Sequence, residues 1–597
     1  MIQAKPPHSF HIPVMGLGFT VDSPLKVAKF GISSVISIMD DHLLEDMRKI
    51  YSQKFGIPFK EIPENQEDYR ANRITAFLNL TFDIVASQIQ KIKEQGLENA
   101  ELLEEFSELL PEENPLKSLI EGFLASNGEE RILLFEKIKE LIQPGAIDVN
   151  IMTKVDKLNY DKNGDTLPRE FSDALSALRG FANSKINGSV VFSAGLNPAL
   201  YSYAEKFDCF LPKGNKNPEK GIILKVSDYR SALIQGKFLA KKGLWVSEFR
   251  IESGLNCGGH AFATDGFLIG PILEEFKRNR NSLKDSLFEV YQKALSEKGI
   301  EVSSNQIAIK ITYQGGIGNA KEDTFLRNYY ELDGTGWGSP FLLVPEATSV
   351  DDDTLQRIIN SKKSDYYLSH ASPLGVPFNN LRTSSGEKQR IERIEKNRPG
   401  SPCYKKFLSF STEFTEKPIC TASRQYQNLK SKQLQNGEIS VDQLKEIEEK
   451  DCLCEGLSAS AILSNGASPR RNLNAVTICP GPNLAYFKGV FSLKEMVAHI
   501  YGKLNLNLDP DRPHVFVKEA QLYVAHLKQE FQKLVSSPSS KQENYLEKFR
   551  GNLEQGIEYY QDLLKSVQVD SEEIYLKMKD QLQILKQELY SLKPNLI

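Results

Sequence analysis

A ten-residue run combines two glycines with a histidine at the end of a predicted buried strand: Ile251-Glu252-Ser253-Gly254-Leu255-Asn256-Cys257-Gly258-Gly259-His260. Glycines allow close approach of the backbone to a bound group, because they have no Cβ. A histidine exchanges protons near neutral pH. The run therefore predicts His260 as a proton-transfer residue beside a cofactor, with a structural core histidine as the alternative. Cys257 could be a nucleophile paired with His260 or a small packing residue.

Two more glycine-containing segments follow, Gly315-Gly316 and Gly338-Ser339. Backbone N–H groups exposed by glycines can bind phosphate oxygens. In (β/α)₈ barrels, phosphate sites are commonly built from the loops after strands seven and eight. The order of these segments therefore predicts a phosphate-bearing cofactor.

Eight short apolar runs separated by helix-like segments are suited to buried parallel strands. Two of the helix-like segments are 228–241 and 266–278. Eight strands alternating with helices predict a (β/α)₈ TIM barrel, whose active site lies at the carboxyl ends of the strands. The predicted strands are Ile12–Gly16, Ser33–Ile38, Ile147–Met152, Ser189–Ser193, Ile222–Val226, Val246–Ile251, Ile307–Thr312 and Leu332–Gly336.

A chain of 597 residues exceeds one ordinary core. We assign residues 1–40 and 144–385 to the barrel and 41–143 to a helical insertion. Residues 386–514 form a cysteine-containing extension and 515–597 a helical tail. In the tail, Met578, Leu582, Leu585, Leu589 and Leu592 repeat at heptad-type spacing. That seam favours packing against its own chain over a dimeric coiled coil.

The ordered motifs resemble FMN-dependent barrel enzymes, which include nitronate monooxygenases, the FMN type of enoyl-ACP reductase and the enoyl reductase of polyunsaturated-fatty-acid synthases. Ile12-Pro13-Val14-Met15-Gly16 is similar to the family's opening strand, and Val149-Asn150-Ile151-Met152 to the strand whose Asn faces the flavin. Gly258-Gly259-His260 matches the family's catalytic Gly-Gly-His. Gly315-Gly316-Ile317 and Gly338-Ser339-Pro340-Phe341-Leu342 resemble its two phosphate-binding segments.

The resemblance implies an FMN-dependent oxidoreductase in which the flavin supplies the redox chemistry. His260 would be the acid or base, and Lys225 would stabilise negative charge on the flavin or substrate. The chain departs from the family at Asn256-Cys257, where Glu-Ala is usual, and at Ser339, where Thr is usual. The implied cofactor-binding residues are Met15, Gly16, Asn150, Lys225, Gly259, Gly315, Gly316, Gly338 and Ser339.

The substrate implied is a small molecule or an acyl group bound to a carrier, with NAD(P)H or oxygen as co-substrate. Two alternatives stay open from the residues alone. One is a non-redox barrel enzyme, an isomerase or lyase, acting on a phosphorylated ligand. The other is a flavin-binding scaffold without turnover.

Five of the seven cysteines fall within one stretch of the extension. They supply enough thiolates for a zinc site or an iron–sulfur cluster. No Cys-x-x-Cys pair occurs among them, so free buried thiols are the alternative reading. These residues are Cys403, Cys420, Cys452, Cys454 and Cys479.

The formal net charge of −4 gives no electrostatic reason to expect nucleic acid as a partner. No run of about 18 apolar residues occurs, so we expect no membrane span. The first residues lack the basic-then-apolar pattern of a signal peptide, which predicts a cytoplasmic protein. An oligomer remains compatible with the sequence.

Overall fold

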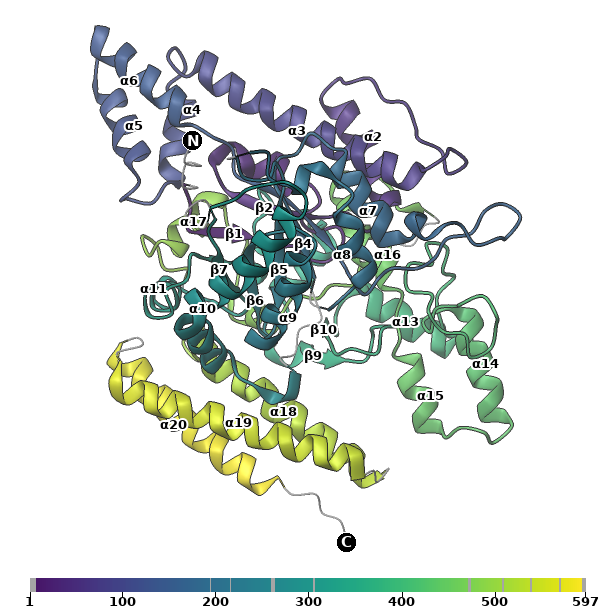
Figure 1. Cartoon of the computed structure of the whole chain (residues 1–597). Helices are drawn as coiled ribbons and strands as arrows, with labels where there is room; N and C mark the ends of the chain where they lie inside the picture. The colour runs from purple at the N-terminus through teal and green to yellow at the C-terminus, as the bar shows by residue number, and fades with distance from the viewer. Residues whose placement is uncertain are drawn as a thin grey trace.

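The centre of the molecule is a closed barrel of eight parallel strands in sequence order, β1 to β8 (Figure 1). This computed structural model describes residues 7–193, 195–214, 216–258, 264–303, 307–470, 474–506, 509–536, 540–567 and 571–592. The predicted (β/α)₈ barrel is therefore confirmed. Its strands are β1 Phe10–Ile12, β2 Ser33–Ser37, β3 Ile147–Ile151, β4 Ser189–Phe192, β5 Gly221–Val226, β6 Val246–Glu252, β7 Lys310–Gln314 and β8 Gly334–Gly336.

Two strands lie elsewhere than predicted. β1 ends at Ile12, because Pro13 has no N–H with which to continue a ladder. β7 begins only at Lys310, where pairing with Glu248 starts, so the apolar residues 307–309 precede the strand. The other six predicted strands overlap the observed ones within two residues at either end.

Polar residues occupy the interior of the barrel because side chains alternate between its two faces. On β6, Glu248, Arg250 and Glu252 share one face, whereas Phe249 packs outward against α9 (Tyr229–Ala240). Arg250 binds Glu248 at 2.8 Å. Burial raises the pKa of Glu248, but the charge of Arg250 and the hydrogen bonds from Arg250 and Thr312 together outweigh burial and lower it to about 2. The barrel is thus lined by a charged network below its mouth.

The helices that connect the strands surround this barrel. Residues 41–143 contain five of them, of which α3 packs against α1, α2 and α7 of the helical ring. Helices α4 to α6 project beyond that ring (Figure 1). The helices up to β8 are α1 Ser23–Val27, α2 Asp41–Lys54, α3 Tyr69–Gln95, α4 Glu101–Leu109, α5 Pro115–Ala125, α6 Gly128–Leu141, α7 Asp173–Ala182, α8 Pro198–Ala204, α9, α10 Ile269–Ser296 and α11 Ala320–Tyr329. Helix α10 is much longer than the predicted segment 266–278 because its apolar face continues to Leu295.

The chain after β8 covers the barrel before it forms the tail. A two-stranded antiparallel sheet, β9 (Tyr366–Ser369) and β10 (Phe378–Leu381), lies among the helices of the extension. The helices are α12 Asp352–Ile359, α13 Ser385–Glu395, α14 Arg424–Gln435, α15 Val441–Glu448, α16 Leu453–Ser464, α17 Leu493–Ile500, α18 Val515–Ser536, α19 Ser540–Ser566 and α20 Glu572–Ser591.

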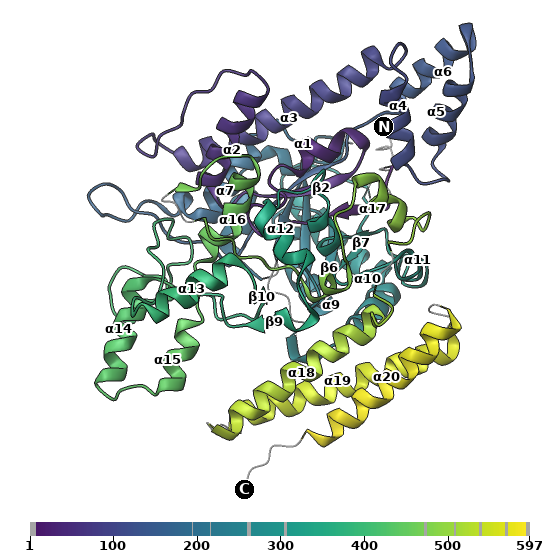
Figure 2. The ribbon, with the colours of Figure 1, turned by 180° about the vertical axis from the view of Figure 1, so that it is seen from behind.

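The tail is a three-helix unit, α18 to α20, at the end of the molecule opposite α4 to α6 (Figure 2). Met578, Leu582, Leu585 and Leu589 form the buried face of α20. This face packs against α18 and α19 of the same chain, as the sequence favoured.

Candidate active site

A pocket lies at the carboxyl ends of the barrel strands, with an empty volume of about 1080 Å³. That volume includes space open to solvent, and the pocket stands where a (β/α)₈ barrel binds its ligand. One wall is formed by the barrel strands and the loops after them, and the other by the chain after β8. The barrel residues that line it are Val14, Gly16, Leu17, Ser37, Met39, Asn150, Met152, Lys154, Val155, Ser193, Lys225, Glu252 and Gly258.

The floor of the pocket is polar because five consecutive strands end in polar side chains there. Ser37, Asn150, Ser193, Lys225 and Glu252 come from β2 to β6 or directly follow them. Each is the last inward-facing position of its strand, as the two-residue side-chain period requires. These side chains can therefore form hydrogen bonds with one edge of a ligand that lies on the floor.

Asn150 carries an unsatisfied acceptor in this floor. Its side chain is 3% exposed, and its Oδ1 atom has no hydrogen-bond partner in the described part of the chain. A buried polar atom without a partner costs about 1–3 kcal/mol. A ligand in the pocket that presents an N–H or O–H donor would remove this cost.

Lys225 is paired rather than free. Its Nζ atom donates to Oε1 of Glu252 at 2.9 Å, and both side chains are buried. Glu252 was not among the predicted site residues. The signal that could have identified it is its place two residues after Arg250 and four after Glu248, on the inward face of the same strand.

The roof of the pocket is apolar and comes from the chain after β8, partly from the extension. Residues 374–378 precede or begin β10, residues 407 and 408 lie in a loop, and residues 453–457 belong to α16. The roof was not predicted, since these residues are far apart in the sequence. They are Leu374, Val376, Phe378, Phe407, Leu408, Leu453, Cys454 and Leu457.

A buried lysine ties this roof to the barrel. Lys405 Nζ donates to Oδ2 of Asp40 at 2.6 Å and to Oγ of Ser458 at 2.7 Å. Asp40 follows β2 and caps α2 by accepting from the N–H of Leu43, whereas Ser458 lies on α16. The contact therefore fixes the pocket-lining helix of the extension against the mouth of the barrel.

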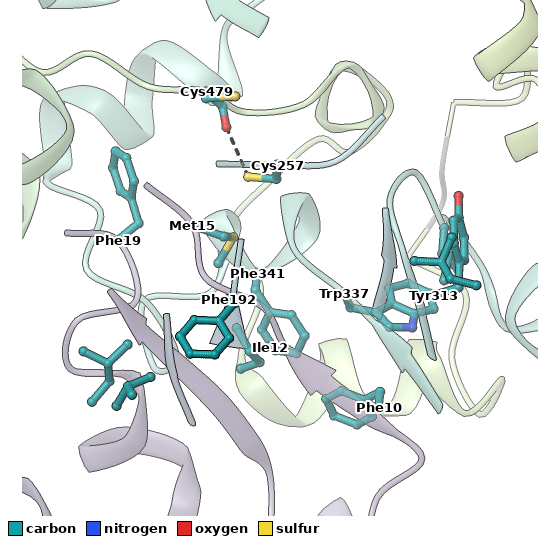
Figure 3. Close-up of a cluster of buried hydrophobic side chains, with 14 of the residues drawn as sticks. Phe10, Ile12, Met15, Phe19, Phe192, Cys257, Tyr313, Trp337, Phe341 and Cys479 are labelled. Atoms are coloured by element: carbon teal, nitrogen blue, oxygen red, sulfur yellow. Dashed lines mark hydrogen bonds between the residues drawn. The ribbon is translucent and has the colours of Figure 1, made fainter. Parts of the chain in front are cut away.

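The glycines at the pocket divide into two groups. Gly16 and Gly258 line the pocket, and a Cβ on Gly258 would lie 2.5 Å from the Gly16 nitrogen. Met15 is buried, and a Cβ on Gly258 would also lie 2.5 Å from its Cα; Figure 3 shows Met15 among the buried side chains. Gly259 and His260 follow Gly258 in the chain but lie outside the described residues.

Gly315, Gly316, Gly338 and Ser339 do not line the pocket. A Cβ on Gly316 would meet Leu255 at 2.5 Å, and one on Gly338 would meet Cys257 at 3.2 Å.

The motif resemblance implies a flavin, and the ring system of a flavin fits this pocket. Apolar walls, the buried Lys225 and the orphaned acceptor of Asn150 suit a flat ring system with N–H and carbonyl groups along one edge. The backbone N–H groups of Gly315 and Gly316, just after β7, are donors of the kind that bind phosphate. However, Leu255 lies against Gly316 and Cys257 against Gly338, and neither glycine lines the pocket.

The described part of the chain gives no support for a metal centre at the cysteines. Cys479 lies at the barrel, where its carbonyl accepts from the thiol of Cys257 at 3.1 Å (Figure 3). Cys452 and Cys454 flank the start of α16, and their pKa values are raised well above 9. Among the described residues, no three His, Cys, Asp or Glu side chains are placed to hold a metal ion. The expected zinc site or iron–sulfur cluster at Cys403, Cys420, Cys452, Cys454 and Cys479 is therefore not supported.

Comparison with known proteins finds likenesses only among solved structures. The enoyl reductase domain of MlnA from the macrolactin biosynthesis cluster of Bacillus amyloliquefaciens is 14% identical, covering 72% of this chain and 87% of its own, with a TM-score of 0.33. A nitroalkane oxidase from Streptomyces ansochromogenes is 10% identical, covering 62% and 83%, with a TM-score of 0.28. No protein-family model and no curated protein matches the chain. An enoyl reductase and a nitroalkane oxidase are thus among the structures that this chain resembles.

Within the described residues, none of the helices combines the length and apolar character needed to cross a membrane.

Proposed function

We propose that the protein is an FMN-dependent oxidoreductase whose flavin ring lies on the polar floor of the pocket. The observation that carries this proposal is the buried, unpaired Oδ1 of Asn150 at the carboxyl end of β3. An acceptor in that position suits the N–H edge of a flavin ring. When bound, the flavin would supply the electron transfer.

The other residues have separate roles in this proposal. Met15 and Gly16 would support the ring, and Gly315, Gly316, Gly338 and Ser339 would hold the phosphate. Lys225, fixed by Glu252, would place positive charge beside the bound ligand. His260, next to Gly259, would transfer protons to or from the substrate. The substrate would be a small molecule or a carrier-bound acyl group.

The test is the absorption spectrum of the purified protein and of Asn150→Leu. We expect the wild type to carry FMN without a covalent bond and Asn150→Leu to lose most of it, because leucine cannot accept the hydrogen bond. Asn183→Leu, at an exposed helix end, is the matched control and should keep the flavin. A colourless wild type that also fails to bind added FMN would instead favour a non-redox enzyme for a phosphorylated ligand.

The co-substrate can be assigned with the same material. Bleaching of the flavin by NADH or NADPH under nitrogen would identify a reductase. Bleaching by a candidate substrate followed by recovery in air would identify an oxidase. A bound flavin that no reagent bleaches would indicate a scaffold without turnover.

A further inference from the structure

Glu252 receives three hydrogen bonds on one carboxylate oxygen. Its Oε1 accepts from Lys225 Nζ at 2.9 Å, from Asn256 Nδ2 at 2.6 Å and from Gln314 Nε2 at 2.6 Å. The side chain is 5% exposed and lines the pocket. One buried carboxylate thus joins the ends of β5, β6 and β7 to the loop that follows β6.

The partners of Glu252 are held in one orientation. An ionised carboxylate can only accept, so both amides must turn their nitrogen atoms toward it. His11 Nε2 lies 3.4 Å from Oε1 of Gln314 and reinforces this orientation. Burial lowers the pKa of His11 to about 3, so the ring is neutral at physiological pH and can donate to that oxygen.

Lys225 depends on Glu252 for its position. In the described part of the chain, Glu252 provides its only hydrogen bond and ion pair. An unpaired ammonium group in this buried place would be strongly disfavoured, whereas the paired group is held at the pocket floor. Glu252 therefore decides whether a positive charge is presented to a ligand.

The loop after β6 depends on the same oxygen. Its backbone turns at Ser253, whose carbonyl accepts from the N–H of Asn256. The side chain of Asn256 then binds Glu252, and the chain continues through Cys257 to Gly258 at the pocket. Gly259 and His260 come next in sequence, so this anchor lies four residues before the proposed proton-transfer residue.

We infer that Glu252 is a positioning residue that holds Lys225 at the pocket floor and anchors the loop leading to His260. It acts through these two elements and not by reacting itself. The effect on ligand binding rests on the proposed FMN function, but the effect on the loop does not. The two can therefore be tested separately.

The loop is tested by amide hydrogen exchange in the full-length protein as purified. We expect the peptide covering residues 253–258 to exchange at least tenfold faster in Glu252→Ala than in the wild type. Glu387→Gln is the matched control, since Glu387 is a buried carboxylate paired with Arg390 on α13, away from the pocket. Unchanged exchange in Glu252→Ala would overturn the anchoring role, whether or not FMN binds.

The link to Lys225 is tested by titrating flavin-free protein with FMN. We expect Glu252→Gln and Lys225→Met each to raise the Kd at least tenfold. The double variant should bind FMN no more weakly than the weaker-binding of the two single variants, because the double variant leaves no unpaired charge. If the fold increase in Kd of the double variant equalled the product of the two single increases, the two residues would act independently, and the proposal would be overturned. A wild type that does not bind FMN would refute the proposed function, while the exchange experiment would still decide the role of Glu252.

Discussion

Glu519 gives the tail a pH-dependent attachment to the barrel. It lies on α18, is completely buried, and its Oε2 accepts from the N–H of Ile269 at 2.8 Å and from the hydroxyl of Tyr560 at 3.4 Å. Its Oε1 has no partner in the described part of the chain. Burial raises the pKa of Glu519 to about 8. Burial also raises the pKa values of the neighbouring Tyr313 and Tyr560 well above 10, so neither tyrosine titrates near neutral pH.

The size of the effect follows from the difference between the folded and unfolded pKa values. In the unfolded chain Glu519 ionises near its ordinary value of 4.5, whereas in the folded chain it stays protonated up to about pH 8. Its contribution to stability is fully present below pH 4.5 and is lost as pH rises through 8. Each pH unit in this window costs about 1.4 kcal/mol, so the loss between pH 5 and pH 8 is roughly 3–4 kcal/mol.

Replacing Glu519 with glutamine removes this titration. The opening free energy of α18 and of the start of α10, measured by native-state hydrogen exchange, should fall between pH 5 and pH 8 in the wild type. In Glu519→Gln it should stay within about 1 kcal/mol over the same range. Glu573→Gln, an exposed carboxylate on α20, should behave like the wild type. Equal pH dependence in Glu519→Gln and the wild type would refute the reasoning.

Three further predictions concern the pocket. His260→Ala should lower turnover by about 10²–10⁴-fold with FMN retained, and loss of flavin and fold together would instead mark His260 as structural. Lys405→Met should destabilise the extension by about 3–5 kcal/mol in chemical denaturation, because it leaves Asp40 buried without its cation; the exposed Lys396→Met should have no such effect. Gly258→Ala should lower the melting temperature more than Gly437→Ala. Both glycines have φ near +75°, but a Cβ at Gly258 would meet the backbone of Met15 and Gly16, whereas nothing lies within 4 Å at Gly437. Equal melting temperatures of the two variants would show that the loop at Gly258 accommodates a Cβ without loss of stability.

The barrel could be predicted because its signals are local. Each buried parallel strand is a short apolar run, and the runs recur at intervals that leave room for a helix. The floor of the pocket could be predicted in part for the same reason, since Asn150 and Lys225 stand at the carboxyl ends of two such runs. Pro13 shows the limit of this approach, because one missing N–H ends β1 where the apolar pattern continues.

The phosphate-binding prediction shows a second limit. A glycine pair indicates that another group lies close to the backbone, but it does not reveal whether that group is a ligand or a side chain of the protein itself. At Gly316 the neighbour is the side chain of Leu255, and at Gly338 it is the Cβ of Cys257, 3.2 Å from where a Cβ would stand. A Gly316→Val variant would therefore strain the protein's own packing before it could obstruct a ligand. The same sequence feature is consistent with a cofactor cradle and with a tight internal contact.

The roof of the pocket was beyond prediction for a different reason. Phe407, Leu453 and Leu457 look like ordinary core residues, and most of the roof indeed belongs to the hydrophobic core. What makes them a roof is the contact of Lys405 with Asp40, which joins positions 365 residues apart. No local pattern encodes that pairing, because a lysine and an aspartate each occur many times in the chain. The barrel therefore sets where a ligand can hydrogen bond, and a long-range ion pair sets which apolar surface faces it.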